Sequence, residues 1–269
     1  MGGLRDDAYG RKRFYGTYNA INNSVANNDE EANGHGTHLA SIIANSERDI
    51  FNRYYGVAPN VRLISVKAFN YDGSARYQDV IRGIDWVIKY KDRYNIRVLN
   101  LSFGSPVKSF YWDDPINLAV MKAWQAGIVV VTSAGNNGSG PMTVGVPGNT
   151  PYVITVGAGT DNYTPADTSD DRISDYSGMG PTVEGFVKPD ISSLGGHVLG
   201  LMDKTTVLAT SHPEFHDGGK YFAMTGTSQS AAVVSGIAAL LLSNQPHLSP
   251  DEVKCKLLDS AKPLLKEDG

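Results

Sequence analysis

Short runs of β-branched apolar residues alternate with helical patterns along most of this 269-residue chain. Four runs predict strands, at residues 61–69, 98–103, 128–132 and 152–156. Apolar residues at helical spacing predict helices at 77–90 and 115–125. The run at 128–132 is apolar on both faces, which is typical of a parallel strand covered by helices on both sides. This order predicts a doubly wound α/β fold with a mainly parallel sheet, which binds ligands at the carboxyl ends of its strands.

Two further helices are predicted in the C-terminal part of the chain. Residues 227–244 are apolar on nearly all sides, so we expect a buried helix. The last helix opens with Ser249 as the N-cap, Pro250 at the first position and Glu252 completing a capping box. The polar stretch at 159–180 is interpreted as surface loops. Because we find no linker and no internal repeat, we expect a single domain over residues 1–269.

Composition excludes several classes of function. The chain has 24 Lys and Arg against 28 Asp and Glu, a formal charge of −4, whereas nucleic-acid binding needs clustered basic residues. The longest apolar run, near 237–242, is too short to span a bilayer, and the N-terminus shows no signal peptide. We therefore expect neither nucleic acid nor a membrane as a partner. The lone Cys255 is interpreted as a structural cysteine.

Three separate segments carry residues with catalytic chemistry. His35 stands between two glycines at the start of an apolar helical pattern, Ser228 opens the 227–244 helix, and Asn136 follows the strand at 128–132. Each residue also fits a structural role: a core histidine, a serine N-cap and an asparagine turn. In the functional interpretation, Ser228 is a nucleophile at a helix N-terminus that binds anions, and Asn136 donates to a developing oxyanion.

Together these segments resemble the subtilisin-like serine proteases, or subtilases. His35 matches the general base in the family's His-Gly-Thr-His motif, Ser228 the nucleophile in Gly-Thr-Ser, and Asn136 the oxyanion asparagine in Ala-Gly-Asn. Further segments match in the family's order between about residues 34 and 264: 56–59, 66–68, 100–104, 143–148, 156–158, 176–181 and 188–191. The resemblance implies the subtilisin-like three-layer fold.

The resemblance also implies a mechanism and a substrate site. Ser228 attacks a peptide carbonyl, His35 takes its proton and returns it to the leaving amine, and Asn136 with the Ser228 N–H holds the oxyanion. Extended substrate pairs with a strand edge by strand addition. The implied specificity pocket comprises Ser102, Phe103 and Gly104 on one side, Ser133, Ala134 and Gly135 on the other, and Gly145 at its base. A glycine there leaves space, so we expect cleavage after large apolar or aromatic residues.

One part of the family pattern is missing. Subtilases carry a catalytic aspartate in an Asp-Ser-Gly or Asp-Thr-Gly motif after an apolar strand, and the 34 residues before His35 contain no such motif. We therefore expect a chain that begins just after this strand and is also cut near its C-terminus. In this family, loss of the aspartate alone costs roughly 3 × 10⁴ in kcat, about 6 kcal/mol, so we expect impaired activity.

Other carboxylates are poor substitutes for the missing aspartate. Asp6 and Asp7 do not follow an apolar strand, and the run Asp29, Glu30 and Glu31 is interpreted as a solvated acidic loop. A missing central strand also leaves two neighbouring strands without a partner, and such edges pair with other chains. We expect the chain either to form a homodimer by strand exchange or to fill the gap with its own N-terminus.

Two departures concern smaller features. Gln229 and Ala232 stand where the family has Met and Pro after the nucleophile, so we expect the site to resist peroxide. The family's calcium loop is not recognisable between Asn45 and Gly56. Glu47, Asp49 and Asn52 offer oxygens there, yet a plain surface loop is favoured. We predict no required cofactor and assign no metal-binding residues. Structural calcium stays open, although no recognisable loop supports it.

Three functions remain open. The leading hypothesis is a secreted subtilisin-like endopeptidase acting on protein or peptide substrates, where secretion is implied by the resemblance. The second is a protease fold that binds peptides without cutting them, which the missing aspartate favours. The third is a residual Ser–His esterase, because acyl transfer from an ester is easier than from an amide.

Overall fold

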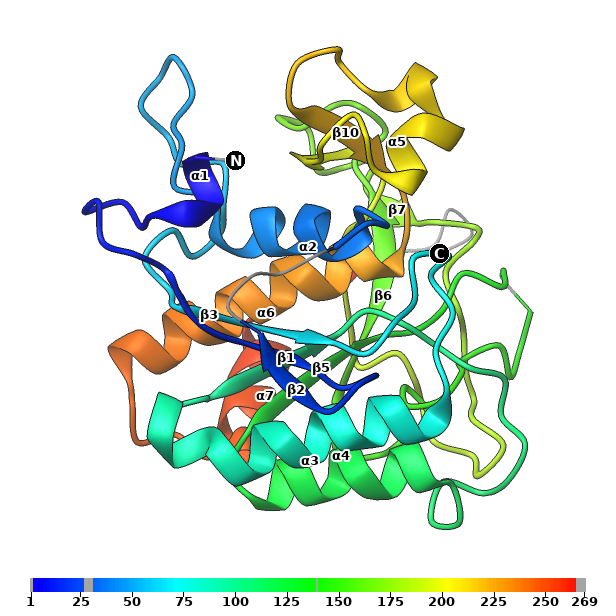
Figure 1. Cartoon of the computed structure of the whole chain (residues 1–269). Helices are drawn as coiled ribbons and strands as arrows, with labels where there is room; N and C mark the ends of the chain where they lie inside the picture. Colours follow the sequence, from blue (N-terminus) through cyan, green and yellow to red (C-terminus); the bar gives the residue numbers. More distant parts are fainter. Residues whose placement is uncertain (1, 27–30, 139, 265–269) are drawn as a thin grey trace. The chain divides into compact units, whose positions relative to one another are not determined.

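The computed structural model describes residues 2–26, 31–138 and 140–264, which fold into alternating strands and helices (Figure 1). The chain divides into two compact units. Unit 1 comprises Met1–Ile96 and Leu199–Met224, and unit 2 comprises Arg97–Val198 and Thr225–Gly269. The α/β class predicted from the alternating pattern is confirmed, whereas the single domain over 1–269 stays a prediction.

The sheet of unit 1 has the order β2-β1-β3. Strand β1 (Phe14–Asn19) pairs antiparallel with β2 (Ser24–Ala26) and parallel with β3 (Leu63–Lys67). Helix α3 (Tyr77–Tyr94) packs on β1, where the Tyr18 and Trp86 rings stack with centroids 4.9 Å apart. The strand predicted at 61–69 and the helix predicted at 77–90 are thus confirmed with shifted ends.

The rest of unit 1 surrounds helix α2 (His35–Ala44). Short helix α1 (Gly2–Arg5) packs against α2, and buried Leu4, Ala44 and Leu201 share one apolar cluster. Strands β9 (Val198–Leu201) and β10 (Tyr221–Met224) pair with each other. Between them lie α5 (Val207–Ser211) and the 3₁₀ turn η1 (Pro213–Phe215).

The sheet of unit 2 carries the nearly continuous apolar runs. Strands β4 (Val98–Leu101), β5 (Val129–Ser133) and β6 (Ile154–Thr160) pair in parallel, and β8 (Ile191–Leu194) adds in parallel to β6. Strand β7 (Arg172–Ile173) pairs antiparallel with β6. Every residue of β5 is buried, which confirms the expectation of a strand covered on both faces.

Three helices cover this sheet. Helix α6 (Thr227–Asn244) contacts β4, β5, β6 and β8, while α4 (Pro115–Gln125) and α7 (Pro250–Ser260) contact β5. In the view of Figure 1, α6 lies above β5 and α4 lies below it. The predicted capping box of α7 is present: Ser249 accepts from the Glu252 N–H, and the Glu252 carboxylate accepts from the Ser249 N–H.

Helix α6 differs from the prediction of complete burial. Ile237 and Leu240 are 40 % and 46 % exposed, although most of the helix is buried. These residues lie three apart and share one face, so a stripe of the helix remains at the surface. None of the helices formed by the described ranges combines the length and apolar character needed to cross a membrane.

Candidate active site

Ser228 lies in the first turn of α6 and is half-buried. Its Oγ donates to the Ser102 carbonyl oxygen at 3.2 Å, and the Ser102 Oγ donates to the Ser228 carbonyl oxygen at 2.9 Å. This reciprocal pair ties the start of α6 to the segment that follows β4. Parallel β4 and the helix N-terminus thus bring the Ser228 hydroxyl to the carboxyl edge of the sheet, where α/β folds bind ligands.

Asn136 follows β5 and is held by the first residue of α6. Its side-chain Oδ1 accepts from the Thr227 N–H at 2.9 Å and from the Thr227 hydroxyl at 3.0 Å. Thr227 Oγ1 in turn accepts from the Gly135 N–H at 3.2 Å. Because the oxygen end of the carboxamide is fixed in this way, the Nδ2 hydrogens remain available as donors. Thr227 is a positioning residue that sequence reasoning did not single out, although it stands inside the Gly-Thr-Ser motif.

The remaining predicted substrate-site residues of unit 2 lie on connected segments. The Ser133 hydroxyl donates to the Phe103 carbonyl oxygen at 3.3 Å, which joins the end of β5 to the segment 102–104. Ser105 and Val146 form an antiparallel bridge through two backbone hydrogen bonds of 2.9 and 2.8 Å. The Ser133–Phe103 bond thus joins the two predicted sides of the pocket, and the Ser105–Val146 bridge places Gly145 beside the segment that follows 102–104.

Gly145 has a structural explanation that differs from the expected one. A Cβ at this position would lie 2.6 Å from the Ser105 backbone oxygen, a distance at which real Cβ atoms are not found. The glycine is therefore needed for the close approach of two backbone segments, whatever space it leaves for a substrate side chain. The preference for large apolar residues does not follow from this glycine alone.

Gln229 is buried beside Ser228. Only 1 % of its surface is exposed, and its Nε2 has no hydrogen-bond partner among the residues that the structure describes. A buried amide without partners is costly in free energy. The departure from the family's methionine therefore places a polar amide in a buried position where its Nε2 has no partner among the described residues.

His35 is the first residue of α2 in unit 1. The helix is preceded by Gly34, whose φ of 103° lies in the left-handed region and where a Cβ would lie 2.9 Å from Thr206 Oγ1. Both constraints favour glycine before the histidine. The Asn33 side chain accepts from the His35 N–H at 3.3 Å. Sequence reasoning thus placed His35 correctly at a helix start.

Glu31 corrects the expectation of a solvated acidic loop. Its carboxylate accepts from the Gly36 and Thr37 N–H groups, each at 2.6 Å, and from the Thr37 hydroxyl. It therefore caps α2, where a negative charge is favourable. Burial lowers the pKa of His35 below its ordinary value, and the charge of Glu31 partly opposes this shift. Asp29 and Glu30 lie outside the described residues.

Neither N-terminal aspartate is available to orient His35. Asp7 accepts from the N–H groups of Tyr9 and Arg11 and from Arg11 Nε, and Asp6 pairs with Arg5. Although burial raises it, the bonds from Arg11 hold the pKa of Asp7 at about 2. In the described part of unit 1, no carboxylate is hydrogen-bonded to the His35 ring.

His38, the second histidine of the motif, has a structural role. It is fully buried, and one ring nitrogen, Nε2, lies 3.0 Å from the Phe222 carbonyl oxygen. A Cβ on Gly200 would lie 2.6 Å from the ring, so the strand passes directly over it. His38 thus fixes α2, and with it His35, against β9 and β10.

The oxygens considered for calcium have protein partners. Glu47 pairs with Lys220, Asp49 pairs with Arg53, and the Asn52 oxygen accepts from Arg48. Over the described ranges, no group of three or more His, Cys, Asp or Glu side chains is arranged to hold a metal ion.

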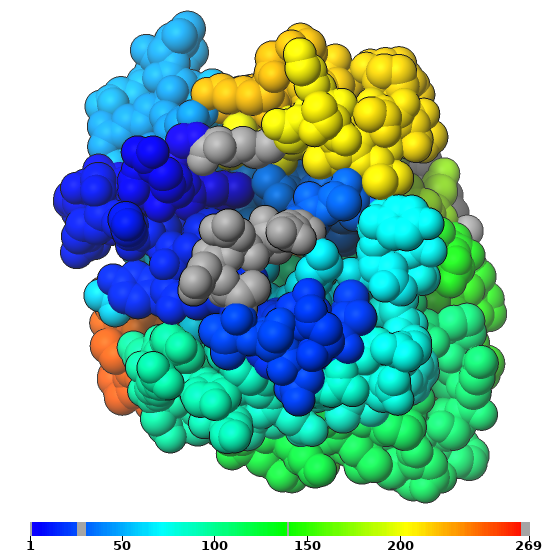
Figure 2. All heavy atoms as spheres, viewed as in Figure 1, coloured from blue at the N-terminus to red at the C-terminus, as the bar shows by residue number. Residues whose placement is uncertain are grey.

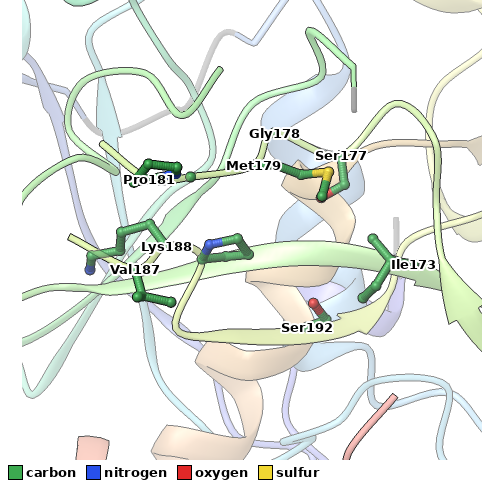
Figure 3. Close-up of a pocket in the computed structure, with 10 residues that line it drawn as sticks. Ile173, Ser177, Gly178, Met179, Pro181, Val187, Lys188 and Ser192 are labelled. Atoms are coloured by element: carbon green, nitrogen blue, oxygen red, sulfur yellow. The ribbon is translucent and has the colours of Figure 1, made fainter. Parts of the chain in front are cut away.

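A cavity of about 350 Å³ lies elsewhere in unit 2 (Figure 3). Its lining is mainly apolar, with Ile173, Met179, Pro181 and Val187 facing it beside Lys188. None of the predicted catalytic or pocket residues is among the residues that line it, so it is separate from the candidate active site.

Comparison with known proteins decides the family. The profile described as the subtilase family matches residues 6–269. The chain belongs to the subtilase family. This subtilase chain is 38 % identical over 247 residues to serine protease AprX of Bacillus subtilis (strain 168), covering 90 % of the chain and 55 % of AprX. It is 34 % identical over 233 residues to subtilisin DY of Bacillus licheniformis, covering 86 % of the chain and 71 % of that protein. The chain thus spans little more than half the length of AprX.

Solved structures support the same fold. A cold adapted subtilisin-like serine proteinase matches with a TM-score of 0.71 and 26 % identity, covering 97 % of this chain and 78 % of that one. The S41 psychrophilic protease matches with a TM-score of 0.77 at 24 % identity, covering 94 % and 78 %. The subtilase chain therefore has the subtilisin-like α/β fold that its motifs imply.

Proposed function

We propose that this subtilase chain is a serine endopeptidase acting outside the cell, with Ser228 as the nucleophile and His35 as the general base. The observation that carries the proposal is the fixed carboxamide of Asn136. Thr227 occupies its oxygen, so its Nδ2 donates to the oxyanion that forms when Ser228 attacks. The Ser228 N–H at the helix start is the second donor in this proposal.

The proposed substrate is an extended polypeptide. A strand that adds antiparallel to the segment 102–104 brings its scissile carbonyl next to Ser228, because Ser228 Oγ lies 3.2 Å from the Ser102 oxygen. The implied pocket residues carry no charge, which is consistent with a large apolar or aromatic residue before the scissile bond.

The activity of this chain on amides is proposed to be low. The described part of unit 1 holds no carboxylate on the His35 ring, and an oriented imidazole depends on such a partner. Ester turnover is expected to survive better than amide turnover, since an alkoxide can leave without prior protonation, whereas an amide nitrogen must first take a proton from the His35 imidazolium. Peptide binding without any turnover would instead favour a binding module.

The test is labelling with a serine-directed fluorophosphonate, followed by intact mass. One adduct is expected on the wild type, retained in the control Ser109→Ala, whose side chain is exposed, and lost in Ser228→Ala. Asn136→Ala is expected to slow labelling by about 10²–10³-fold, whereas Asn137→Ala, one residue along, leaves the rate unchanged. An adduct that persists in Ser228→Ala, or equal rates in both asparagine variants, would overturn the proposal.

A further inference from the structure

Residues 48–54 of unit 1 form a hairpin that displays two apolar side chains. Arg48 and Tyr54 form an antiparallel bridge at its base. Ile50 and Phe51 at its tip are 93 % and 70 % exposed. Figure 1 shows this light-blue segment projecting beyond α1 and α2, and in Figure 2 its atoms form a protruding knob. The two apolar side chains therefore form a convex tip.

The tip is rigidly built. Asp49 accepts from the Phe51 and Arg53 N–H groups, each at 2.9 Å, and from Arg53 Nε at 2.8 Å. The Asp49 and Asn52 N–H groups donate to the Arg53 and Asp49 carbonyl oxygens at 2.9 and 3.0 Å. Because this network fixes the turn, Ile50 and Phe51 cannot bury themselves by local collapse, and their display is a property of the fold.

Cationic side chains flank the tip. The Arg48 guanidinium lies 4.2 Å from the centroid of the Tyr54 ring, and that of Arg53 lies 5.1 Å from the centroid of the Phe51 ring. The base of the hairpin is joined to the N-terminal segment, since Ser46 donates to the carbonyl oxygens of Gly3 and Asp6.

The surface around the hairpin carries a small positive excess, in contrast to the chain as a whole. Residues 2–12 and 45–56, with Lys220 that pairs with Glu47, carry six basic and four acidic side chains, a balance of +2. The formal charge of the whole chain is −4. An anionic partner is therefore favoured at this surface.

The shape and chemistry of the tip fit a lipid surface better than a folded protein. A stable protein interface needs roughly 800 Å² from each partner, whereas two side chains on a convex tip offer far less. Peripheral membrane binding combines a small inserted apolar area with attraction of Lys and Arg to anionic lipids, and Tyr is enriched at the interface. Although the lack of a membrane-spanning run led us to expect no membrane partner, peripheral docking needs no such run, and we propose that the 48–54 hairpin docks this protein on an anionic lipid surface. Ile50 and Phe51 enter the headgroup boundary, and Arg48, which forms no ion pair among the described residues, contacts the headgroups, whereas Arg53 remains paired with Asp49.

The experiment is co-sedimentation of the full chain with vesicles of phosphatidylcholine alone, or of phosphatidylcholine and phosphatidylglycerol in equal parts. The wild type is expected to bind the anionic vesicles, less at high salt, and hardly the neutral ones. Ile50→Ser with Phe51→Ser is expected to weaken binding at least about tenfold, and Arg48→Gln about fivefold. Val25→Ser, which removes an apolar side chain that is also 70 % exposed, is expected to leave binding unchanged.

A second measurement locates the tip directly. In Phe51→Trp, the emission maximum of the introduced tryptophan is expected to shift to shorter wavelength with anionic vesicles and to stay unchanged with neutral ones. Circular dichroism of the tip variants is expected to match the wild type, because exposed side chains contribute little to stability. Equal binding by the wild type and the double tip variant would overturn the proposal. It would also be overturned if the tip mediates self-association in solution without vesicle binding.

Discussion

At the scale of single residues, the most informative position is Gln229. Its buried Nε2 has no partner in the described part of the chain, while its backbone belongs to the turn that presents Ser228. We predict that Gln229→Met stabilises unit 2 by about 1–2 kcal/mol, because an apolar side chain of similar length removes an unpaired buried amide. Urea unfolding of both proteins measures the difference. A less stable variant would mean that the amide has a hydrogen-bond partner in solution.

The same substitution tests the expected resistance to peroxide. Wild-type Ser228 is predicted to keep its labelling rate after peroxide treatment, and Gln229→Met to lose it, because a methionine sulfoxide beside the nucleophile is larger and polar. The six methionines of the chain are present in both proteins and serve as an internal control. Equal inactivation of the two proteins would assign peroxide damage to another site.

His35 is expected to show a shifted pH profile. Burial lowers its pKa, and a general base must be neutral, so the labelling rate of Ser228 is predicted to fall only below the ordinary histidine pKa of about 6.5. Since the Glu31 charge raises this pKa, Glu31→Gln is predicted to move the inflection to still lower pH. An inflection that moves upward in this variant would contradict the assignment. The variant keeps an acceptor oxygen but loses the negative charge at the N-terminus of α2, and is expected to be up to about 1 kcal/mol less stable.

At the scale of elements, a buried ion cluster joins α7 to the sheet of unit 2. Lys188 Nζ donates to the Val153 carbonyl oxygen, to Thr155 Oγ1 and to Asp190 Oδ2, with distances of 3.0, 3.0 and 2.6 Å. Lys254 of α7 pairs with the other Asp190 oxygen at 2.9 Å. Burial lowers the pKa of Lys188 to about 8, although the charge of Asp190 raises it.

This cluster gives stability a defined pH dependence. Between pH 8 and the unfolded lysine pKa near 10.5, the unfolded chain binds the proton that the folded chain has lost, so stability rises with pH. Relative to Lys188→Met, the wild type is predicted to gain up to about 3 kcal/mol from pH 7 to pH 10. Chemical unfolding of both proteins at the two pH values measures this gain. A constant difference would show that Lys188 titrates as an ordinary lysine.

Helices and strands that are determined by neighbouring residues could be predicted from the sequence, whereas those that depend on distant contacts could not. The bounds of α4 and α6 and the capping box of α7 follow from periodicity and from side-chain capping over a few residues. Strands β9 and β10 were missed because they are four residues each and depend on pairing with one another.

The candidate site shows the same division. His35, Ser228 and Asn136 stand in short motifs that a sequence displays. The roles of Thr227 and Glu31 depend on side chains meeting backbone groups across loops, which no spacing in the sequence reveals. The place of Gly145 at the base of the pocket stays a prediction, and the structure adds a different reason for a glycine there, the close approach of the Ser105 backbone.

At the scale of the whole molecule, β3 and β4 each stand at one edge of a described sheet. Strand β3 stands at the end of the order β2-β1-β3, and β4 at the end of the order β4-β5-β6-β7. Val98, Leu99 and Asn100 of β4 are only partly buried, whereas all of β5 is buried. An apolar strand at a sheet edge is a template for pairing with another chain.

We predict that the chain associates with itself through the edge of β4. Light scattering after size-exclusion chromatography is expected to show a mass that rises with concentration above the monomer's 29.0 kDa. Val98→Lys is predicted to reduce association, since lysine on an edge strand opposes pairing. Leu118→Lys on the surface of α4 is the matched control, because it adds the same charge outside any strand.

A mass that stays at 29.0 kDa at every concentration would contradict the predicted self-association. If the double variant Ile50→Ser with Phe51→Ser abolishes association and Val98→Lys does not, the self-association surface is the hairpin tip and not the edge of β4.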